Sequence, residues 1–163
     1  MLITIKNKET LIVDDFKFKC CIGKNGITKF KKEGDKSTPK GKFRIGTLYY
    51  RPDRVRKPIS KIKRKIIQKN LGWCNDPKNK NYNKEIKVSK KIKYEKIYRN
   101  DYKYNYFIVI EYNIKKIIPN KGSAIFLHLT KDYKPTAGCI AISEKDFLIL
   151  LKIVNKKTKI NIN

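Results

Sequence analysis

One histidine and four cysteines are the residues best suited to nucleophilic chemistry, namely His128, Cys20, Cys21, Cys74 and Cys139. His128 belongs to the apolar run 124–129, and Cys139 follows eleven residues later, directly after Gly138. A neutral imidazole that takes the proton of a thiol leaves a thiolate, which attacks carbonyl carbon atoms. The sequence therefore indicates Cys139 as a candidate nucleophile and His128 as its candidate general base.

The position of Cys139 distinguishes it from the other cysteines. Cys20 and Cys21 fall inside an alternating strand pattern, where cysteine usually acts as a small buried hydrophobe. If the apolar run 124–129 pairs with a strand at 139–142, the intervening loop returns Cys139 to the carboxyl end of the strand that carries His128. The backbone N–H groups of Cys139 and of its loop neighbours Ala137 and Gly138 would then hold the oxyanion of an acyl-transfer reaction.

The elements that position these residues are mostly strands. Period-2 alternation and short apolar runs predict strands over residues 3–5, 11–13, 16–22, 43–49, 104–112, 124–129, 140–142 and 159–162. Ser143 as N-cap, with Asp146 three residues on and an apolar stripe as far as Val154, predicts a helix over 144–154. We expect a mainly β fold, a sandwich or open barrel that carries one or two helices.

The length of 163 residues favours a single domain over 1–163. Between residues 51 and 100 the periodicity weakens, and prolines and lysines punctuate the sequence. We expect this segment to be an insertion of loops and short helices beside the sheet, placed as a lid.

The charge is strongly basic, with 41 Lys and Arg against 14 Asp and Glu, a formal net charge of +27. Such a field attracts anions, so a non-enzymatic module that binds nucleic acid or an acidic wall polymer is an alternative to an enzyme. Lysine is spread along the chain and no nucleic-acid-binding motif occurs, which argues against specific nucleic-acid recognition. A compositional bias toward Lys, Asn and Ile is the explanation of the charge that we favour. We predict no transmembrane segment, because no window is long and apolar enough.

Several motifs together resemble the L,D-transpeptidase catalytic domain family (YkuD-like), in a compact single-domain branch. They are KEGDKSTPKGKF at 32–43, GWCNDP at 72–77, GSAIFLH at 122–128 and PTAGCIAIS at 135–143. The resemblance implies a mixed β-sandwich and a Cys–His acyltransferase that acts on peptidoglycan stem peptides. By position it makes Cys139 the nucleophile and His128 the base, with a backbone carbonyl as the third partner of the histidine. No cofactor and no metal are implied.

The resemblance leaves the acyl acceptor open. The family commonly has His before Gly-Cys, where this chain has Ala137, and the usual Arg after the nucleophile is absent. Cross-linking, lipoprotein attachment and hydrolysis, the last as an L,D-carboxypeptidase or another cysteine hydrolase of wall peptides, therefore remain alternatives. A periplasmic or envelope location is implied, although no signal peptide is visible in the sequence, and a cytoplasmic location stays an alternative.

Six further residues are candidates for substrate binding. Arg51, Arg54, Arg99 and Trp73 are expected to line a groove in which arginine pairs with the carboxylates of the stem peptide. Thr136 matches the Ser or Thr of the family motif, and Ser123 lies in the motif that ends at His128.

Overall fold

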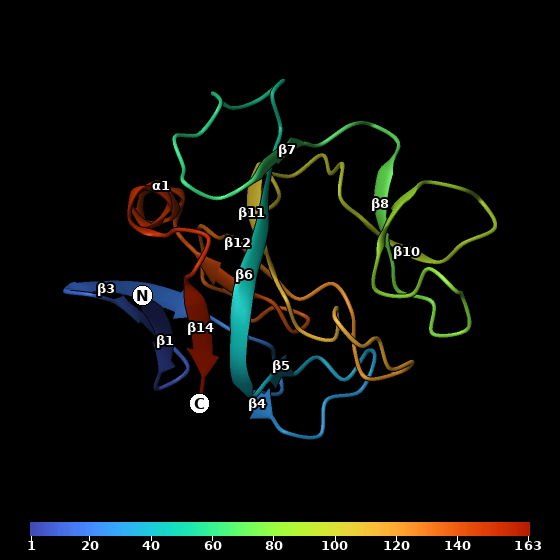
Figure 1. Ribbon diagram of the computed structural model, residues 1–163, viewed down its shortest axis with the longest axis horizontal. Coiled ribbons are helices and arrows are strands. Elements are labelled where there is room, and N and C mark those ends of the chain that lie inside the picture. Colours follow the sequence, from blue (N-terminus) through green and yellow to red (C-terminus); the bar gives the residue numbers. More distant parts are fainter.

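An N-terminal meander of three strands begins the sheet in the computed structural model, which describes all 163 residues (Figure 1). The strands are β1 (Leu2–Lys6), β2 (Thr10–Val13) and β3 (Phe16–Cys21), and both pairings are antiparallel. Ile3, Ile5, Leu11 and Val13 are all buried on one face, as alternation along a strand requires. The strands predicted over 3–5, 11–13 and 16–22 are confirmed.

The other large strands close this sheet on itself. They are β6 (Gly41–Tyr50), β7 (Arg64–Ile66), β11 (Tyr106–Ile110), β12 (Phe126–Leu129), β13 (Ile140–Ile142) and β14 (Lys159–Ile162). The order is β11-β12-β13-β3-β2-β1-β14-β6-β7, and β6 also pairs with β11. β6 joins the two halves because residues 41–44 pair with β14, whereas residues 45–50 pair with β11. Parallel β1–β14, β12–β13 and β6–β7 pairs make the sheet mixed, as expected.

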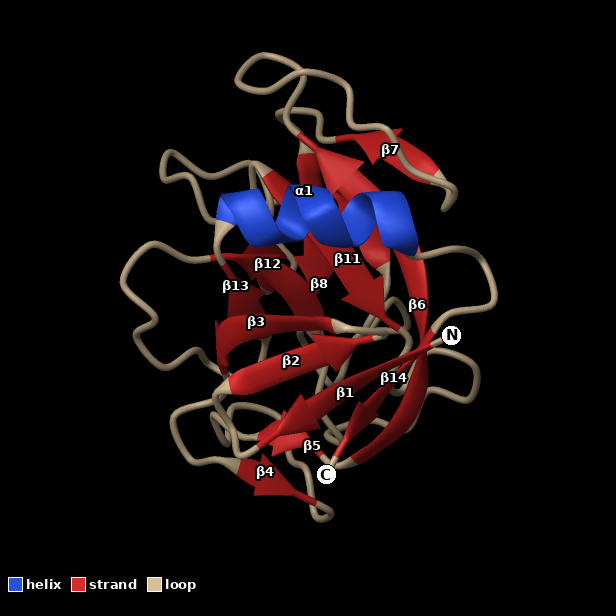
Figure 2. Cartoon of the chain, turned by 90° about the vertical axis from the view of Figure 1, so that its left-hand side faces the viewer, coloured by secondary structure: helices blue, strands red, loops and turns tan.

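A single helix, α1 (Glu144–Ile153), packs against this sheet (Figure 2). Its N-cap is Ser143, whose hydroxyl accepts a hydrogen bond from the Asp146 N–H at 3.1 Å. Phe147, Leu150 and Leu151 are buried in the main core. The helix predicted over 144–154 is confirmed. None of the helical segments combines the length and the apolar character that a membrane span requires.

The strands β11 and β12 are buried on both faces, which creates two separate cores. Ile108 and Leu127 face the main core beneath α1, whereas Phe107 and Phe126 face a second core on the other side. His128 and Cys139 alternate onto this second side. The two candidate catalytic residues therefore lie on the face of the sheet that α1 does not cover.

Residues 51–100 cover the face of the sheet opposite α1, the second face. Besides β7 they contain β8 (Leu71–Cys74), β9 (Glu85–Lys87) and β10 (Tyr94–Lys96), which form a three-stranded antiparallel sheet in the order β10-β8-β9. Figure 1 shows β8 and β10 on the opposite side of β6 and β11 from α1. The expected insertion is loop-rich, but it contains short strands and no helix. Strands of three or four residues are too short to display a period.

Two shorter strands, β4 (Ile27–Thr28) and β5 (Thr38–Pro39), pair with each other beneath the sheet. They bracket a loop over residues 29–37 that reaches the second face. This loop supports the residues before Cys139.

Candidate active site

The register of β12 and β13 brings His128 and Cys139 onto one face. The two strands are parallel, with Leu127 opposite Ile140 and His128 opposite Ala141. Cys139 therefore lies opposite Phe126, two residues before His128. The strands are adjacent, as predicted, but Cys139 lies at the amino end of β12 rather than at its carboxyl end. The reason is that the connection crosses back to form a parallel pair.

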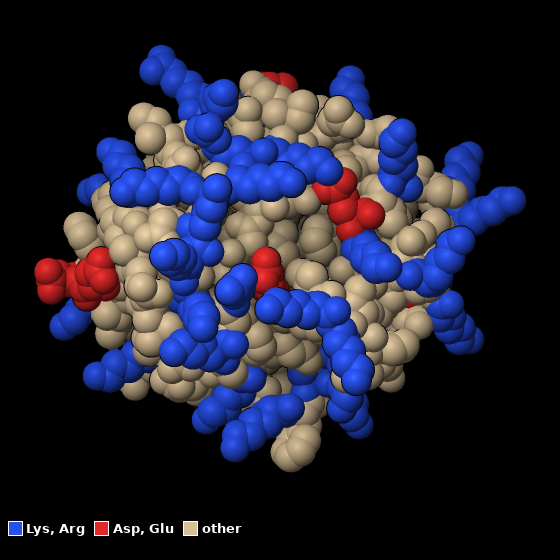
Figure 3. All heavy atoms as spheres, viewed as in Figure 1, with Lys and Arg blue, Asp and Glu red and all other residues tan.

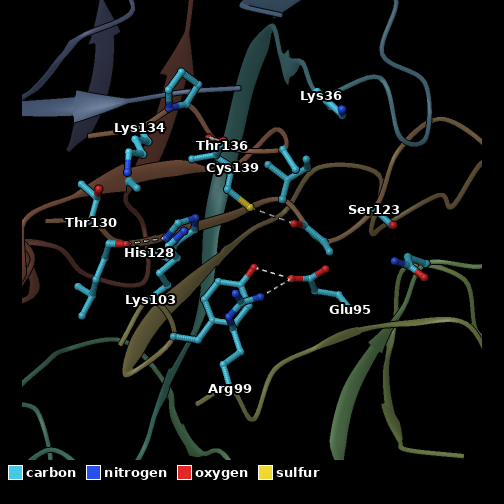
Figure 4. A pocket seen from close by; sticks show the side chains of 18 of the residues that line it. Lys36, Glu95, Arg99, Lys103, Ser123, His128, Thr130, Lys134, Thr136 and Cys139 are labelled. Carbon is cyan, nitrogen blue, oxygen red and sulfur yellow. Dashed lines mark hydrogen bonds and ion pairs between the residues drawn. The ribbon is translucent and has the colours of Figure 1, made fainter. Parts of the chain in front are cut away.

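Both side chains line one open pocket of about 420 Å³. The pocket is walled by parts of the loops 31–36, 123–125 and 130–137 and by residues from the end of the insertion. In Figure 4 the imidazole of His128 and the sulfur of Cys139 point toward one another across this pocket. Their exposed fractions are only 6% and 9%, so the walls shield both groups while leaving them within reach of a ligand.

The sulfur of Cys139 is held by two backbone groups. Its S–H donates to the carbonyl oxygen of Ala124 at 3.3 Å, and the N–H of Phe126 donates to the sulfur at 3.4 Å. Burial raises the pKa of the Cys139 thiol to about 12, although the Phe126 N–H favours the thiolate. The thiol is thus protonated at neutral pH and would need a base in order to act as a nucleophile.

His128 has the protonation state and orientation of that base. Its Nδ1 lies 2.9 Å from the carbonyl oxygen of Leu129. Because a carbonyl only accepts, Nδ1 carries the hydrogen and Nε2 keeps its lone pair. Burial lowers the pKa of His128 to about 4, so the ring is neutral at neutral pH. A backbone carbonyl is therefore the third partner, as the resemblance implies.

The turn before Cys139 presents free backbone donors. The hydroxyl of Thr136 donates to the carbonyl oxygen of Cys139 at 2.6 Å and accepts from the N–H of Gly138 at 3.1 Å. The Gly138 N–H is therefore engaged, contrary to its expected role as an oxyanion donor. The N–H groups of Ala137 and Cys139 have no hydrogen-bond partner in the structure. They are the donors that a developing oxyanion can use.

Gly138 is required at this turn by both conformation and space. Its φ is 135°, and an added Cβ would lie 2.8 Å from the carbonyl oxygen of Ser37. The carbonyl of Gly138 also accepts a hydrogen bond from the Thr38 hydroxyl at 3.0 Å. The loop over 29–37 and β5 thus fix the turn, and only glycine fits between them.

We expect Gly138→Ala to lower the free energy of unfolding by about 2 kcal/mol or more, because it combines backbone strain with a clash. Gly34→Ala is the matched control, since Gly34 also has a positive φ of 74° but nothing lies within 4 Å of an added Cβ. Urea unfolding of both variants measures the difference. Equal losses in the two would contradict the close contact with Ser37.

Charged side chains surround the reactive pair. Basic residues outnumber acidic ones in the wall, which contains Lys31, Lys36, Arg99, Lys103 and Lys134 against Glu33, Glu95 and Asp132. Lys31 pairs with Asp35 and Arg99 pairs with Asp101, each at 2.5 Å. Lys36 and Lys103 have no carboxylate partner in the structure, so they are free to bind a substrate carboxylate.

The remaining sequence candidates divide into two groups. Arg99, Ser123 and Thr136 line the pocket, although the Ser123 hydroxyl already donates to Glu33 at 2.7 Å. Outside the pocket lie Arg51, Arg54 and Trp73.

Each of these three has a structural partner instead. The guanidinium of Arg51 is buried, pairs with Asp53 at 2.7 Å and stacks on the ring of Tyr98. Arg54 donates to the carbonyl oxygens of Asn100 and Asp101. Trp73 packs edge-on against Phe126 in the second core. These three residues therefore do not line the pocket with Arg99, contrary to the expectation from the sequence.

Tyr104 and Glu95 are site residues that the sequence did not single out. The Tyr104 hydroxyl donates to Glu95 at 2.9 Å, and its ring packs edge-on against His128 with centroids 5.3 Å apart. Both residues line the pocket, and Glu95 is labelled in Figure 4. No local signal marks them, because they reach the site only through the pairing of β10 with β8 and of β11 with β12.

The surface charge is not gathered at the site. Figure 3 shows Lys and Arg side chains spread over the whole visible face. A scattered distribution suits general attraction of anions rather than a shaped nucleic-acid groove.

Comparison with known protein families identifies the family of the chain. A family model, described as the L,D-transpeptidase catalytic domain (YkuD), matches residues 2–162. A search of curated proteins finds no match.

Proposed function

The chain belongs to the L,D-transpeptidase catalytic domain family, and from that premise we propose that it is a cysteine acyltransferase acting on peptidoglycan stem peptides. The observation that carries the proposal is the pocket that Cys139 and His128 share, in which a protonated thiol and a neutral imidazole with a free nitrogen lie on the same wall. Its site of action is then the periplasm or cell envelope, where such peptides occur.

The first half-reaction forms a thioester. His128 Nε2 takes the proton of the Cys139 thiol as the sulfur attacks the carbonyl carbon between diaminopimelate and the terminal D-Ala. The oxyanion that forms is held by the N–H groups of Cys139 and Ala137. When the intermediate collapses, the C–N bond breaks and His128 returns its proton to the amine of the departing D-Ala.

The second half-reaction transfers the acyl group. An amine of a second stem attacks the thioester carbonyl, and His128 takes the proton that this amine loses. The C–S bond then breaks, the sulfur leaves as a thiolate, and His128 reprotonates it. Water in place of the amine yields a trimmed tripeptide stem, which is the carboxypeptidase alternative.

The charges of the pocket suit this substrate. Stem peptides carry carboxylates, and the unpaired ammonium groups of Lys36 and Lys103 lie in the pocket wall. The wall also contains the carboxylate of Glu95, which suits a substrate that carries ammonium groups as well.

Product analysis tests the proposal and identifies the acceptor. Purified protein incubated with disaccharide-tetrapeptide is expected to release D-Ala, as measured by mass spectrometry of the muropeptides. A cross-linked dimer identifies an amine acceptor, and a tripeptide monomer identifies water. Absence of D-Ala release under conditions in which the protein stays folded would overturn the assignment.

A further inference from the structure

Ala124 has an unusual backbone conformation next to the reactive sulfur. Its φ is 53°, in the left-handed region that alanine adopts only against steric resistance. Its carbonyl oxygen is the acceptor for the Cys139 thiol at 3.3 Å. A strained residue that touches the reactive atom requires a partner that holds it in place.

That partner is the side chain of Asn83, which lies in the insertion, 41 residues earlier in the chain. Asn83 Oδ1 accepts from the N–H of Ala124 at 3.1 Å and from the indole N–H of Trp73 at 2.9 Å. Its Nδ2 donates to the carbonyl oxygens of Tyr112 at 3.1 Å and Asn113 at 2.7 Å. Only 3% of the Asn83 surface is exposed. The amide therefore connects the insertion to two other segments of the chain, residues 112–113 and Ala124.

We propose that Asn83 is a positioning residue for the nucleophile, which holds Ala124 in its left-handed conformation so that the Ala124 carbonyl fixes the direction of the Cys139 thiol. The inference rests on the proposed function, because it assigns Asn83 a role toward the same sulfur. Asn83 itself does not line the pocket and touches no substrate.

The side-chain chemistry explains why an amide is needed there. Two N–H groups point at Oδ1 and two carbonyls point at Nδ2, so the position requires one acceptor atom and one donor atom. A carboxylate would face the carbonyls of Tyr112 and Asn113 without a hydrogen to donate. An alanine would leave four buried polar groups without partners.

A double-mutant cycle between Asn83 and Ala124 tests the proposal. Asn83→Ala is expected to lower kcat on tetrapeptide stems about tenfold with little change in KM, because the sulfur loses its fixed direction while the charged side chains of the pocket wall, such as Lys36 and Lys103, stay in place. In an Ala124→Gly background the same change should cost at most about threefold, because glycine adopts the left-handed conformation without steric cost. If Asn83→Ala does not fold, Asn83→Ser provides the same comparison.

The rate of Cys139 alkylation by iodoacetamide gives a readout that is independent of turnover. We expect it to rise about fivefold in Asn83→Ala, because the S–H loses its acceptor, and to fall back in the double variant. Cys20 and Cys74 in the same digest report unfolding, since both are fully buried. Thr158→Val is the stability control, because it removes a buried hydrogen bond to the Asn155 N–H outside the pocket.

The outcomes separate the two proposals. Equal losses of kcat for Asn83→Ala in both backgrounds, or an equal alkylation increase in Thr158→Val, would reduce Asn83 to a structural residue and overturn the inference. A wild-type protein without turnover would overturn the proposed function, and the alkylation rates would still decide the role of Asn83.

Discussion

Replacing Cys139 with alanine is expected to lower kcat/KM for D-Ala release by about 10⁴-fold or more, because the reaction then has no nucleophile. Serine at this position should be nearly as inactive, since the neutral ring of His128 is matched to a thiol and a hydroxyl ionises far less readily. Chromatographic measurement of released D-Ala provides the rates. The fold should persist in both variants, because each substitution removes or exchanges a single atom.

Cys74→Ala is the matched control for this substitution. Cys74 is also a fully buried free thiol, but it lies in β8 and outside the pocket. We expect this variant to lose some stability through a small cavity and to keep its turnover. A Cys139→Ala protein that retains more than about one hundredth of wild-type activity would contradict a thioester mechanism.

Replacing His128 with glutamine is expected to lower kcat/KM by about 10³-fold at neutral pH, within the range that a general base contributes. The amide fills much of the ring's volume but cannot take a proton. Circular dichroism checks that the second core stays intact around it. A loss of less than about tenfold would mean that the Cys139 proton leaves by another route.

The pH dependence of kcat/KM distinguishes the loss of a general base in His128→Gln from a disruption of the site's structure. Burial lowers the pKa of His128 to about 4, so the wild-type ring is a competent base above that pH and kcat/KM falls only as the pH drops toward 4. Burial raises the pKa of Cys139 to about 12. Without the imidazole, the rate should therefore climb with pH through the alkaline range as solvent forms the thiolate. A flat profile for His128→Gln would contradict the assigned base.

The proximity of His128 and Cys139 could be predicted from the sequence because its signals are local. An apolar run ending near His128 and a glycine turn before Cys139 identify two adjacent strand segments and a loop. The helix after Ser143 could be predicted for the same reason, since the cap and the apolar stripe are both encoded within residues 143–154.

The surroundings of His128 and Cys139 could not be predicted from the sequence, because they depend on contacts between segments that are distant in the chain. Arg51 is a plausible carboxylate ligand by type, yet its partner is Asp53, two residues away, and its guanidinium is buried. Trp73 is a plausible groove residue, yet its indole N–H is directed at Asn83 in the core. Residue type indicates what a side chain can bind, and only the fold decides which way it faces.

Covalent trapping tests the central claim most directly. Wild-type protein is mixed with tetrapeptide stem, quenched in acid within one turnover, digested and mapped by mass spectrometry. The account predicts a stem acyl group lacking D-Ala on the peptide that contains Cys139, and none on that peptide in His128→Gln. An acyl group on Cys20, Cys21 or Cys74, or D-Ala release without any covalent adduct, would contradict it.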